Sequence, residues 1–167
     1  MKTISYEAIE EVSVALAGLK EFDAQKLVHS FGEQQPVLME YLASVGADEE
    51  VNFTEAENEV LFFIGVTLWK AMSSQAEIPP VDENALVEIE EKVFDELELY
   101  DAESGEDFDE FIDKTFSKSY NQYPLLEYIL DSVFDALEDE ELDVTEDSAG
   151  LMIGYLKTCI DAMDAQS

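Results

Sequence analysis

Two stretches of the chain, residues 6–19 and 83–99, carry apolar side chains at the spacing of one helix face. The apolar positions recur three and four residues apart, which is the period of an amphipathic α-helix. They are Ile9, Val12, Ala15, Leu16 and Leu19 in the first stretch, and Leu86, Ile89, Val93, Phe94 and Leu97 in the second. The pattern therefore predicts one helix in each stretch.

Shorter helices are expected to follow each of these, at residues 23–31 and 108–116. A third helix in each half is expected to begin at a proline, Pro36 or Pro124, because proline suits the first turn of a helix. Strand signals are few, since the chain has no Asn-Gly hairpin turn and no sustained two-residue alternation. The chain is therefore predicted to be all-α.

The last helix of each half is expected to start after a threonine, Thr54 or Thr145. A threonine at this position accepts a hydrogen bond from an otherwise unpaired backbone N–H of the first turn. Thr54 and Glu57 also have the spacing of a capping box, in which each side chain bonds the other residue's backbone. With these two helices, the predicted number of helices is about eight.

These last helices are apolar on nearly all sides, over Val60–Trp69 and Leu151–Ile160. Such helices must be largely buried, and Gly65, Gly150 and Gly154 lie inside them, where a close helix–helix approach would explain them. We therefore expect one bundle around two apolar central helices, with a stacked helical-repeat superhelix as the alternative. Leucine at Gly65 or Gly154 is then expected to destabilise the fold.

The two halves of the chain resemble each other. Three blocks match in the same order, at offsets of 80, 87 and 91 residues: 9–11 with 89–91, 35–42 with 122–129, and 51–75 with 142–166. Rising offsets are expected if the second copy gained residues in its loops. With a boundary at Pro79-Pro80, we predict a single domain, 1–167, built from two tandem four-helix repeats, 1–79 and 80–167.

Charge is the most unusual property of the composition. The chain has 41 acidic residues, eight lysines, no arginine and a net charge of −33. Residues 1–79 hold 14 of the acids and residues 80–167 hold 27. This field repels nucleic acids and phosphorylated substrates, so neither is expected as a ligand. The longest apolar run is about half a membrane span, and the single cysteine suits a reducing compartment, so a cytoplasmic location without membrane contact is expected.

Few residues are candidates for chemistry. The single histidine, His29, is expected to be a surface residue, and Cys159 a packing residue of an apolar helix. Trp69 and the Phe62-Phe63 pair are expected to fill the core. Counted from Asp101, the acidic run fails the calcium-loop pattern, and the sequence contains no nucleophile–base set. We therefore expect no enzyme activity, no cofactor and no metal site.

A non-catalytic interaction module for a basic protein is the function that the charge favours, with oligomeric state left open. The predicted partner-binding residues form two acidic runs: Asp101, Glu103, Glu106, Asp107, Asp109 and Glu110, and then Glu138, Asp139, Glu140 and Glu141. A DNA-mimic inhibitor of a DNA-binding protein is one alternative, because B-DNA carries about 24 charges over the roughly 40 Å that this chain would span. An enzyme without a recognisable motif is another, and acidity that serves only solubility is a third.

Overall fold

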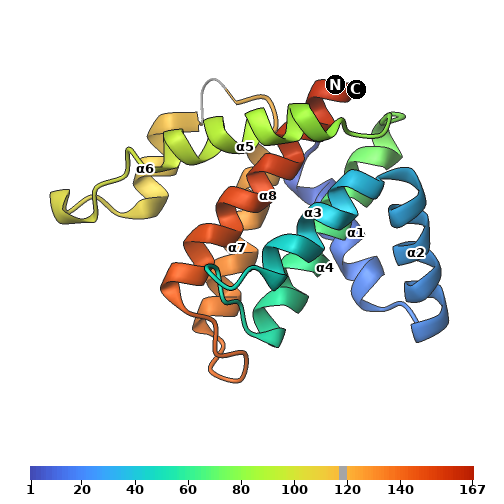
Figure 1. The fold of residues 1–167 in the computed structure, drawn as a ribbon, viewed down its shortest axis with the longest axis horizontal. Coiled ribbons are helices and arrows are strands. Elements are labelled where there is room, and N and C mark those ends of the chain that lie inside the picture. Colours follow the sequence, from blue (N-terminus) through green and yellow to red (C-terminus); the bar gives the residue numbers. More distant parts are fainter. Residues whose placement is uncertain (117–119) are drawn as a thin grey trace.

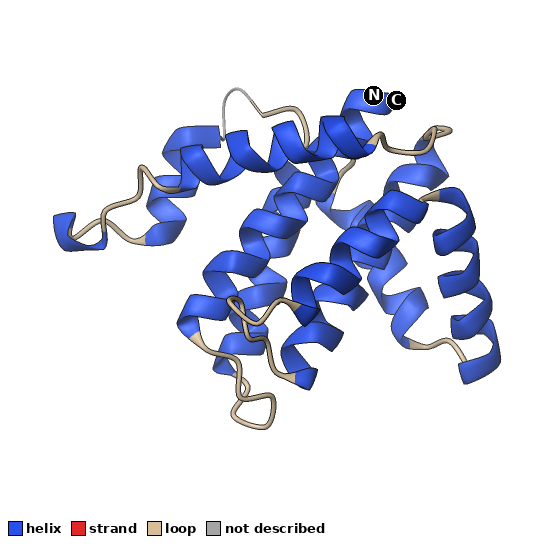
Figure 2. Ribbon diagram, in the orientation of Figure 1, coloured by secondary structure: helices blue, strands red, loops and turns tan. Residues whose placement is uncertain are grey.

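A computed structural model describes residues 1–116 and 120–167 and confirms an all-α fold. Within the described residues there are eight α-helices, one short 3-10 helix and no strand (Figure 2). The helices are α1 Tyr6–Ala17, α2 Glu21–Gln34, α3 Pro36–Ala47, α4 Glu55–Gln75, α5 Glu83–Leu97, η1 Ala102–Ser104, α6 Phe108–Phe116, α7 Tyr123–Glu138 and α8 Glu146–Gln166. The predicted bounds are reproduced for α6 and approximated elsewhere.

The predicted helix starts rest on side-chain caps. Thr54 and Thr145 are the N-caps of α4 and α8, and each accepts a hydrogen bond from a first-turn backbone N–H at 3.1 Å. The capping box is also present, because the Thr54 N–H donates to Glu57 Oε1 at 2.8 Å. These local bonds explain why sequence alone located both helices.

Helices α4 and α8 pack against each other and contain long runs of buried residues. Helices α5 and α7 also pack on α8, while α1, α2, α3 and α7 pack on α4 (Figure 1). Trp69 is buried beside the Phe31 ring at 5.1 Å, as predicted. The prediction is wrong for Phe63, which is 38% exposed, because neighbouring helix positions point about 100° apart and only some of them face the core. Phe62 is partly buried and packs against the core, with its ring 6.2 Å from that of Phe31.

Two of the three predicted close approaches at glycine occur. A Cβ added to Gly65 would lie 2.6 Å from Leu42 Cδ1 of α3, and one added to Gly154 would lie 2.5 Å from Phe94 Cζ of α5. The prediction for Gly150 is wrong, because that glycine is exposed and has no neighbour within 4 Å of such an atom. Gly150 lies on the outer side of the first turns of α8, where nothing packs against it.

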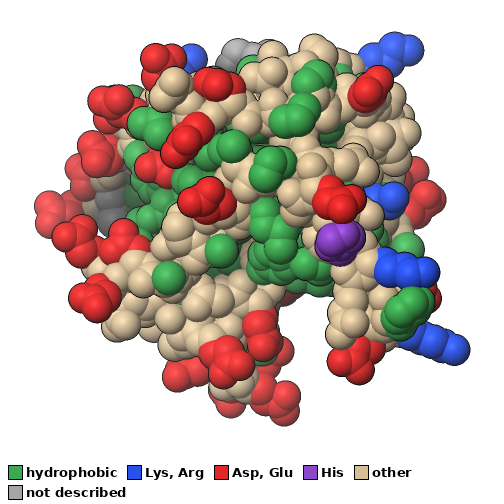
Figure 3. Space-filling view, turned by 45° about the vertical axis from the view of Figure 1, so that its right-hand side comes forward, with side chains coloured by type: hydrophobic (Ala, Val, Ile, Leu, Met, Phe, Trp, Pro, Cys, Tyr) green, Lys and Arg blue, Asp and Glu red, His purple; other side chains and the backbone are tan. Residues whose placement is uncertain are grey.

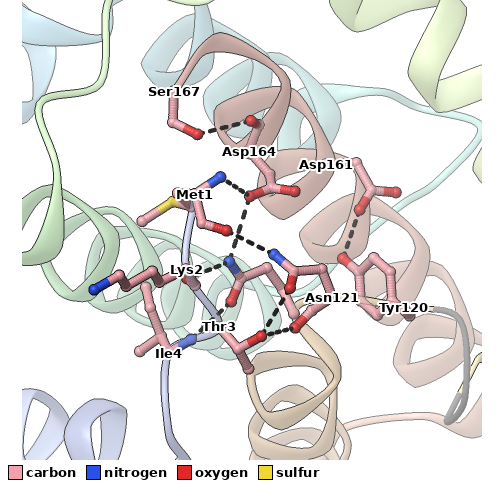
Figure 4. A network of polar contacts seen from close by, with 10 residues as sticks. Met1, Lys2, Thr3, Ile4, Tyr120, Asn121, Asp161, Asp164 and Ser167 are labelled. Atoms are coloured by element: carbon pink, nitrogen blue, oxygen red, sulfur yellow. Dashed lines mark hydrogen bonds and ion pairs between the residues drawn. The ribbon is translucent and has the colours of Figure 1, made fainter.

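Two buried glutamines, each just before a proline-started helix, hold a distant extended segment. The Gln35 amide donates to the Pro79 carbonyl at 3.0 Å and accepts from the Val81 N–H at 2.9 Å. The Gln122 amide donates to the Lys2 carbonyl at 3.0 Å, and its oxygen accepts from the Ile4 N–H at 3.1 Å. The second arrangement is part of the network in Figure 4, beside Asn121 and Asp164. Each amide thus fixes the segment that enters α5 or α1.

Glu57 joins the starts of the two long helices. Its side chain accepts from the Thr54 N–H through Oε1 and from the Thr145 N–H through Oε2, the latter at 3.1 Å. Burial alone would raise the pKa of this carboxyl, but the hydrogen bonds from Thr54, Ser148 and Thr145 outweigh it, so the pKa is lowered. The folded state therefore favours an ionised Glu57.

We expect Glu57→Gln to lower the free energy of unfolding by about 1–3 kcal/mol at neutral pH, because the amide nitrogen cannot accept the second backbone bond. A lowered folded pKa contributes stability above the unfolded pKa and loses it as pH falls through the folded value. The difference between variant and wild type should therefore shrink in acid. Urea unfolding at several pH values measures it, with the exposed Glu59→Gln as control. A difference independent of pH would contradict the role of the charge.

Candidate interaction surface

The first predicted acidic run lies on η1 and the start of α6, at one end of the molecule (Figure 1). Aromatic rings attach this segment to the rest of the fold. The Tyr100 ring lies 5.1 Å from that of Phe108, which in turn is 6.5 Å from the Phe134 ring of α7. The Tyr100 hydroxyl also donates to the Glu106 carbonyl at 3.0 Å. The acidic segment is therefore held on α7 by an apolar contact.

Most carboxylates of this run face solvent. Asp101, Glu103, Asp107, Asp109 and Glu110 are exposed. Glu106 is partly buried and forms an ion pair with Lys114 at 2.9 Å. Desolvation, followed by the nearby Asp131 and Asp107 carboxylates, raises the pKa of Asp109. Neighbouring carboxylates therefore add to the effect of desolvation on this group.

The second predicted run, Glu138–Glu141, lies at the end of α7 and in the turn that follows, and all four residues are exposed. The last turn of α7 contains no basic residue, so these acids lie at the negative end of the helix dipole, where they do not stabilise the helix. Figure 1 places this turn and η1 at different ends of the molecule. The structure therefore does not bring the two predicted runs together.

One residue of the second run, Asp139, also borders a groove that the sequence did not indicate. The groove has a volume of about 690 Å³ and lies between α1, α4 and α7. Apolar side chains form much of its lining, and the other acidic residues along it are Glu59 and Asp135. The residues that α4 contributes include Ala56, Glu59, Val60 and Phe63. The helical spacing of these residues is visible in the sequence. The exposure of Phe63 depends on how the other helices pack on α4, which the sequence does not show.

A largely buried group of polar side chains lies between α5 and α8, beside a cleft of about 400 Å³. Lys157 is 3% exposed, and its ammonium lies 2.7 Å from Asp161 Oδ2 and above the rings of Phe116 and Tyr120, at 4.6 and 4.4 Å from their centres. The Tyr120 hydroxyl donates to Asp161 Oδ1 at 2.5 Å (Figure 4). Both oxygens of Asp161 and the Lys157 ammonium are thus already engaged within the chain.

Burial raises the pKa of Tyr120 well above its usual value, and the Asp161 carboxylate raises it further. Tyr120 therefore stays protonated and keeps donating its hydrogen bond. Within the protein this arrangement behaves as an internal ion pair, and it offers no free acid or base for proton transfer. Sequence reasoning missed it because Lys157 appears there as a single charge within an apolar helix.

The single cysteine and histidine lie where they were predicted. Cys159 is buried, and burial, followed by the Glu90 and Asp161 carboxylates, raises the pKa of its thiol to about 12. A thiol held neutral in this way is a poor nucleophile. His29 is exposed on α2 and its Nε2 lies 2.9 Å from Glu33.

Comparison with known proteins does not add a relationship. No protein-family model, no curated protein and no solved structure matches the chain. Across residues 1–116 and 120–167, no helix is both long and apolar enough to span a membrane. In the same described part, no three His, Cys, Asp or Glu side chains are grouped so that they could hold a metal ion.

Proposed function

We propose that this protein is a non-catalytic interaction module that binds a basic partner protein through its carboxylate surface. The observation that carries the proposal is the lack of internal neutralisation. Four ion pairs are found within the described residues, and one of them involves the single histidine. On the face drawn in Figure 3, acidic side chains gather at the left and along the lower edge, beside exposed apolar ones, and lysines lie mainly at the right. Such a surface attracts a basic partner and speeds its capture.

The position of the acids also favours a role outside the fold. Among the described helices, α6 alone has a basic residue in its last turn, so the end of α7 is left without a compensating lysine. Acids that served helix stability would gather at N-termini, as Asp109 and Glu110 do in the first turn of α6. Position therefore favours such a role for Glu138–Glu141, and exposure to solvent supports it for the run at Asp101–Glu110; we propose that both contribute to partner binding.

We also propose that residues 1–79 and 80–167 are two copies of one unit, arranged around α4 and α8 as central helices. The matching bonds of Gln35 and Gln122 support this, because each glutamine holds the segment that leads into the other half's first helix. The N-caps Thr54 and Thr145, which share Glu57, support it as well. Ile4 and Val81 donate the equivalent bonds to these glutamines, so they are equivalent positions of the two copies. The first helices then correspond at an offset of 77 residues, rather than the 80 that the sequence match indicated.

Affinity capture tests the proposed function. The immobilised protein is expected to retain a basic protein from cytosol at low salt and to release it as salt rises, because exposed charges are screened. Amide replacement of Asp101, Glu103, Asp107, Asp109 and Glu110 together should reduce retention. A matched variant has amides at five exposed positions of the first half: Glu10, Glu11, Glu40, Glu49 and Glu50. It should retain more of the basic protein than the first variant does.

Three outcomes separate the alternatives. Equal loss in the two variants would mean that net charge acts without a defined surface. Retention of nothing basic at low salt would contradict the proposal and leave acidity as a solubility property. Displacement of the captured protein by duplex DNA would show that it uses its DNA-binding site, as the mimic hypothesis requires.

A further inference from the structure

The groove between α1, α4 and α7 has the chemistry of a docking site for a helix. It combines an apolar lining with acidic residues on two of its three helices. We propose that this groove binds an amphipathic basic helix of the partner protein, so that apolar side chains of that helix enter the groove and its lysines or arginines meet the acidic residues. The inference rests on the proposed function and names the part of the surface that selects the partner.

The lining of the groove includes a partly exposed aromatic side chain. Phe63 is 38% exposed, although it lies in the most apolar stretch of α4. Val60 lies one turn before it and lines the same groove. Leu142, from the turn before α8, extends the apolar lining. An amphipathic helix presents apolar side chains three and four residues apart, and aromatic residues in such contacts supply much of the binding energy.

The acidic residues at the groove restrict the partner further. Glu59 belongs to α4, Asp135 to the last turn of α7, and Asp139 is the C-cap residue of that helix. Asp139 Oδ1 accepts a hydrogen bond from the Glu141 N–H at 3.0 Å, so this oxygen serves the turn after α7. Asp131, one turn before Asp135, accepts a hydrogen bond from the Tyr6 hydroxyl at 2.7 Å. Within the described part of the chain, Asp135 has no such partner and no lysine lines the groove.

Charge also disfavours a second copy of this chain as the occupant. Two molecules that each carry a net charge of −33 repel each other, and the acidic residues of the groove would face further carboxylates. A basic helix gains from the same residues. Lysines or arginines four residues apart on that helix would lie about one turn apart, so two of them can meet Asp135 and the C-cap residue Asp139.

Peptide binding tests the assignment. The probe is a fluorescently labelled peptide of about four helical turns, with leucines on one helix face and lysines elsewhere, compared with a scrambled peptide of the same composition. We expect the amphipathic peptide to bind more tightly, as measured by fluorescence anisotropy. Phe63→Ser should weaken its binding about tenfold or more, and Asp135→Asn with Asp139→Asn about threefold to tenfold.

Matched variants control for charge and for exposed apolar area. The charge control, Glu88→Gln with Glu91→Gln, removes two exposed acids of α5. The control for apolar area, Phe22→Ser, removes an aromatic ring of α2 that is 66% exposed. Neither variant should change binding of the amphipathic peptide by more than about twofold. Ser132→Arg, which places a bulky cation in the groove without removing a core group, should also abolish tight binding. This variant decides the matter if Phe63→Ser unfolds.

The two proposals fail in different ways. If both peptides bind equally and the groove variants match the controls, the groove is not the docking site, while the basic-partner function stands. If neither peptide binds at low salt and no basic protein is captured, the proposed function fails together with this inference. The groove is supported as the docking site if the amphipathic peptide binds more tightly than the scrambled one and Phe63→Ser or Ser132→Arg weakens that binding.

Discussion

Asp161→Ala is expected to lower the free energy of unfolding by about 3–5 kcal/mol. The change leaves the Lys157 ammonium buried and without its carboxylate partner at 2.7 Å, and it also removes the acceptor of the Tyr120 hydroxyl. The two aromatic rings beside the ammonium replace only part of this interaction. Urea unfolding followed by fluorescence of Trp69, the single and buried tryptophan, measures the loss.

The reverse deletion is expected to cost less. Lys157→Met keeps most of the packing of the side chain, and the remaining Asp161 carboxylate is 22% exposed, so it can still contact water and Tyr120. We expect a loss of about 1–2 kcal/mol. The double variant should be more stable than Asp161→Ala alone, because it removes the unpaired buried charge. Equal stability of those two variants would show that Lys157 does not depend on Asp161.

Gly154→Leu is expected to destabilise the protein by about 1–3 kcal/mol, because any side chain at this position meets the Phe94 ring of α5. Gly154→Ala should be unfavourable for the same reason, since the clash begins at Cβ, 2.5 Å from Phe94 Cζ. Alanine at Gly150, one turn earlier on the same helix, meets nothing and should stabilise by about 0.5–1 kcal/mol through helix propensity. Thermal and urea unfolding of the three variants measures the contrast, and equal effects of alanine at the two glycines would contradict the observed packing.

The groove and the ion pair show where sequence reasoning was insufficient. Phe63 and Trp69 lie in the same apolar stretch of α4, yet Trp69 is buried and Phe63 is accessible. Helical periodicity specifies only the direction in which each side chain points. Whether that direction ends in another helix or in solvent depends on contacts between residues that are distant in the chain. The same limit applies to Gly150 and Gly154, which look alike in the sequence.

The acidic residues illustrate the limit for function. Composition alone predicted a field that favours basic partners, because net charge is a sum that needs no geometry. The position of each carboxylate does need geometry. Glu57 is 1% exposed and serves two helix caps, whereas Asp139 is exposed and borders the groove. The class of partner thus stays a prediction from charge, and the fold separates buried carboxylates from exposed ones.

By itself, the sequence determined the all-α class, the approximate helix positions and the caps at Thr54 and Thr145, because these depend on bonds between residues within one turn. Tertiary structure alone decided that Gln35 and Gln122 hold distant segments, that Lys157 is buried against Asp161, and that an apolar groove opens beside α4. Those features depend on how helices far apart in the chain pack, and local patterns do not specify which side chains meet in that packing.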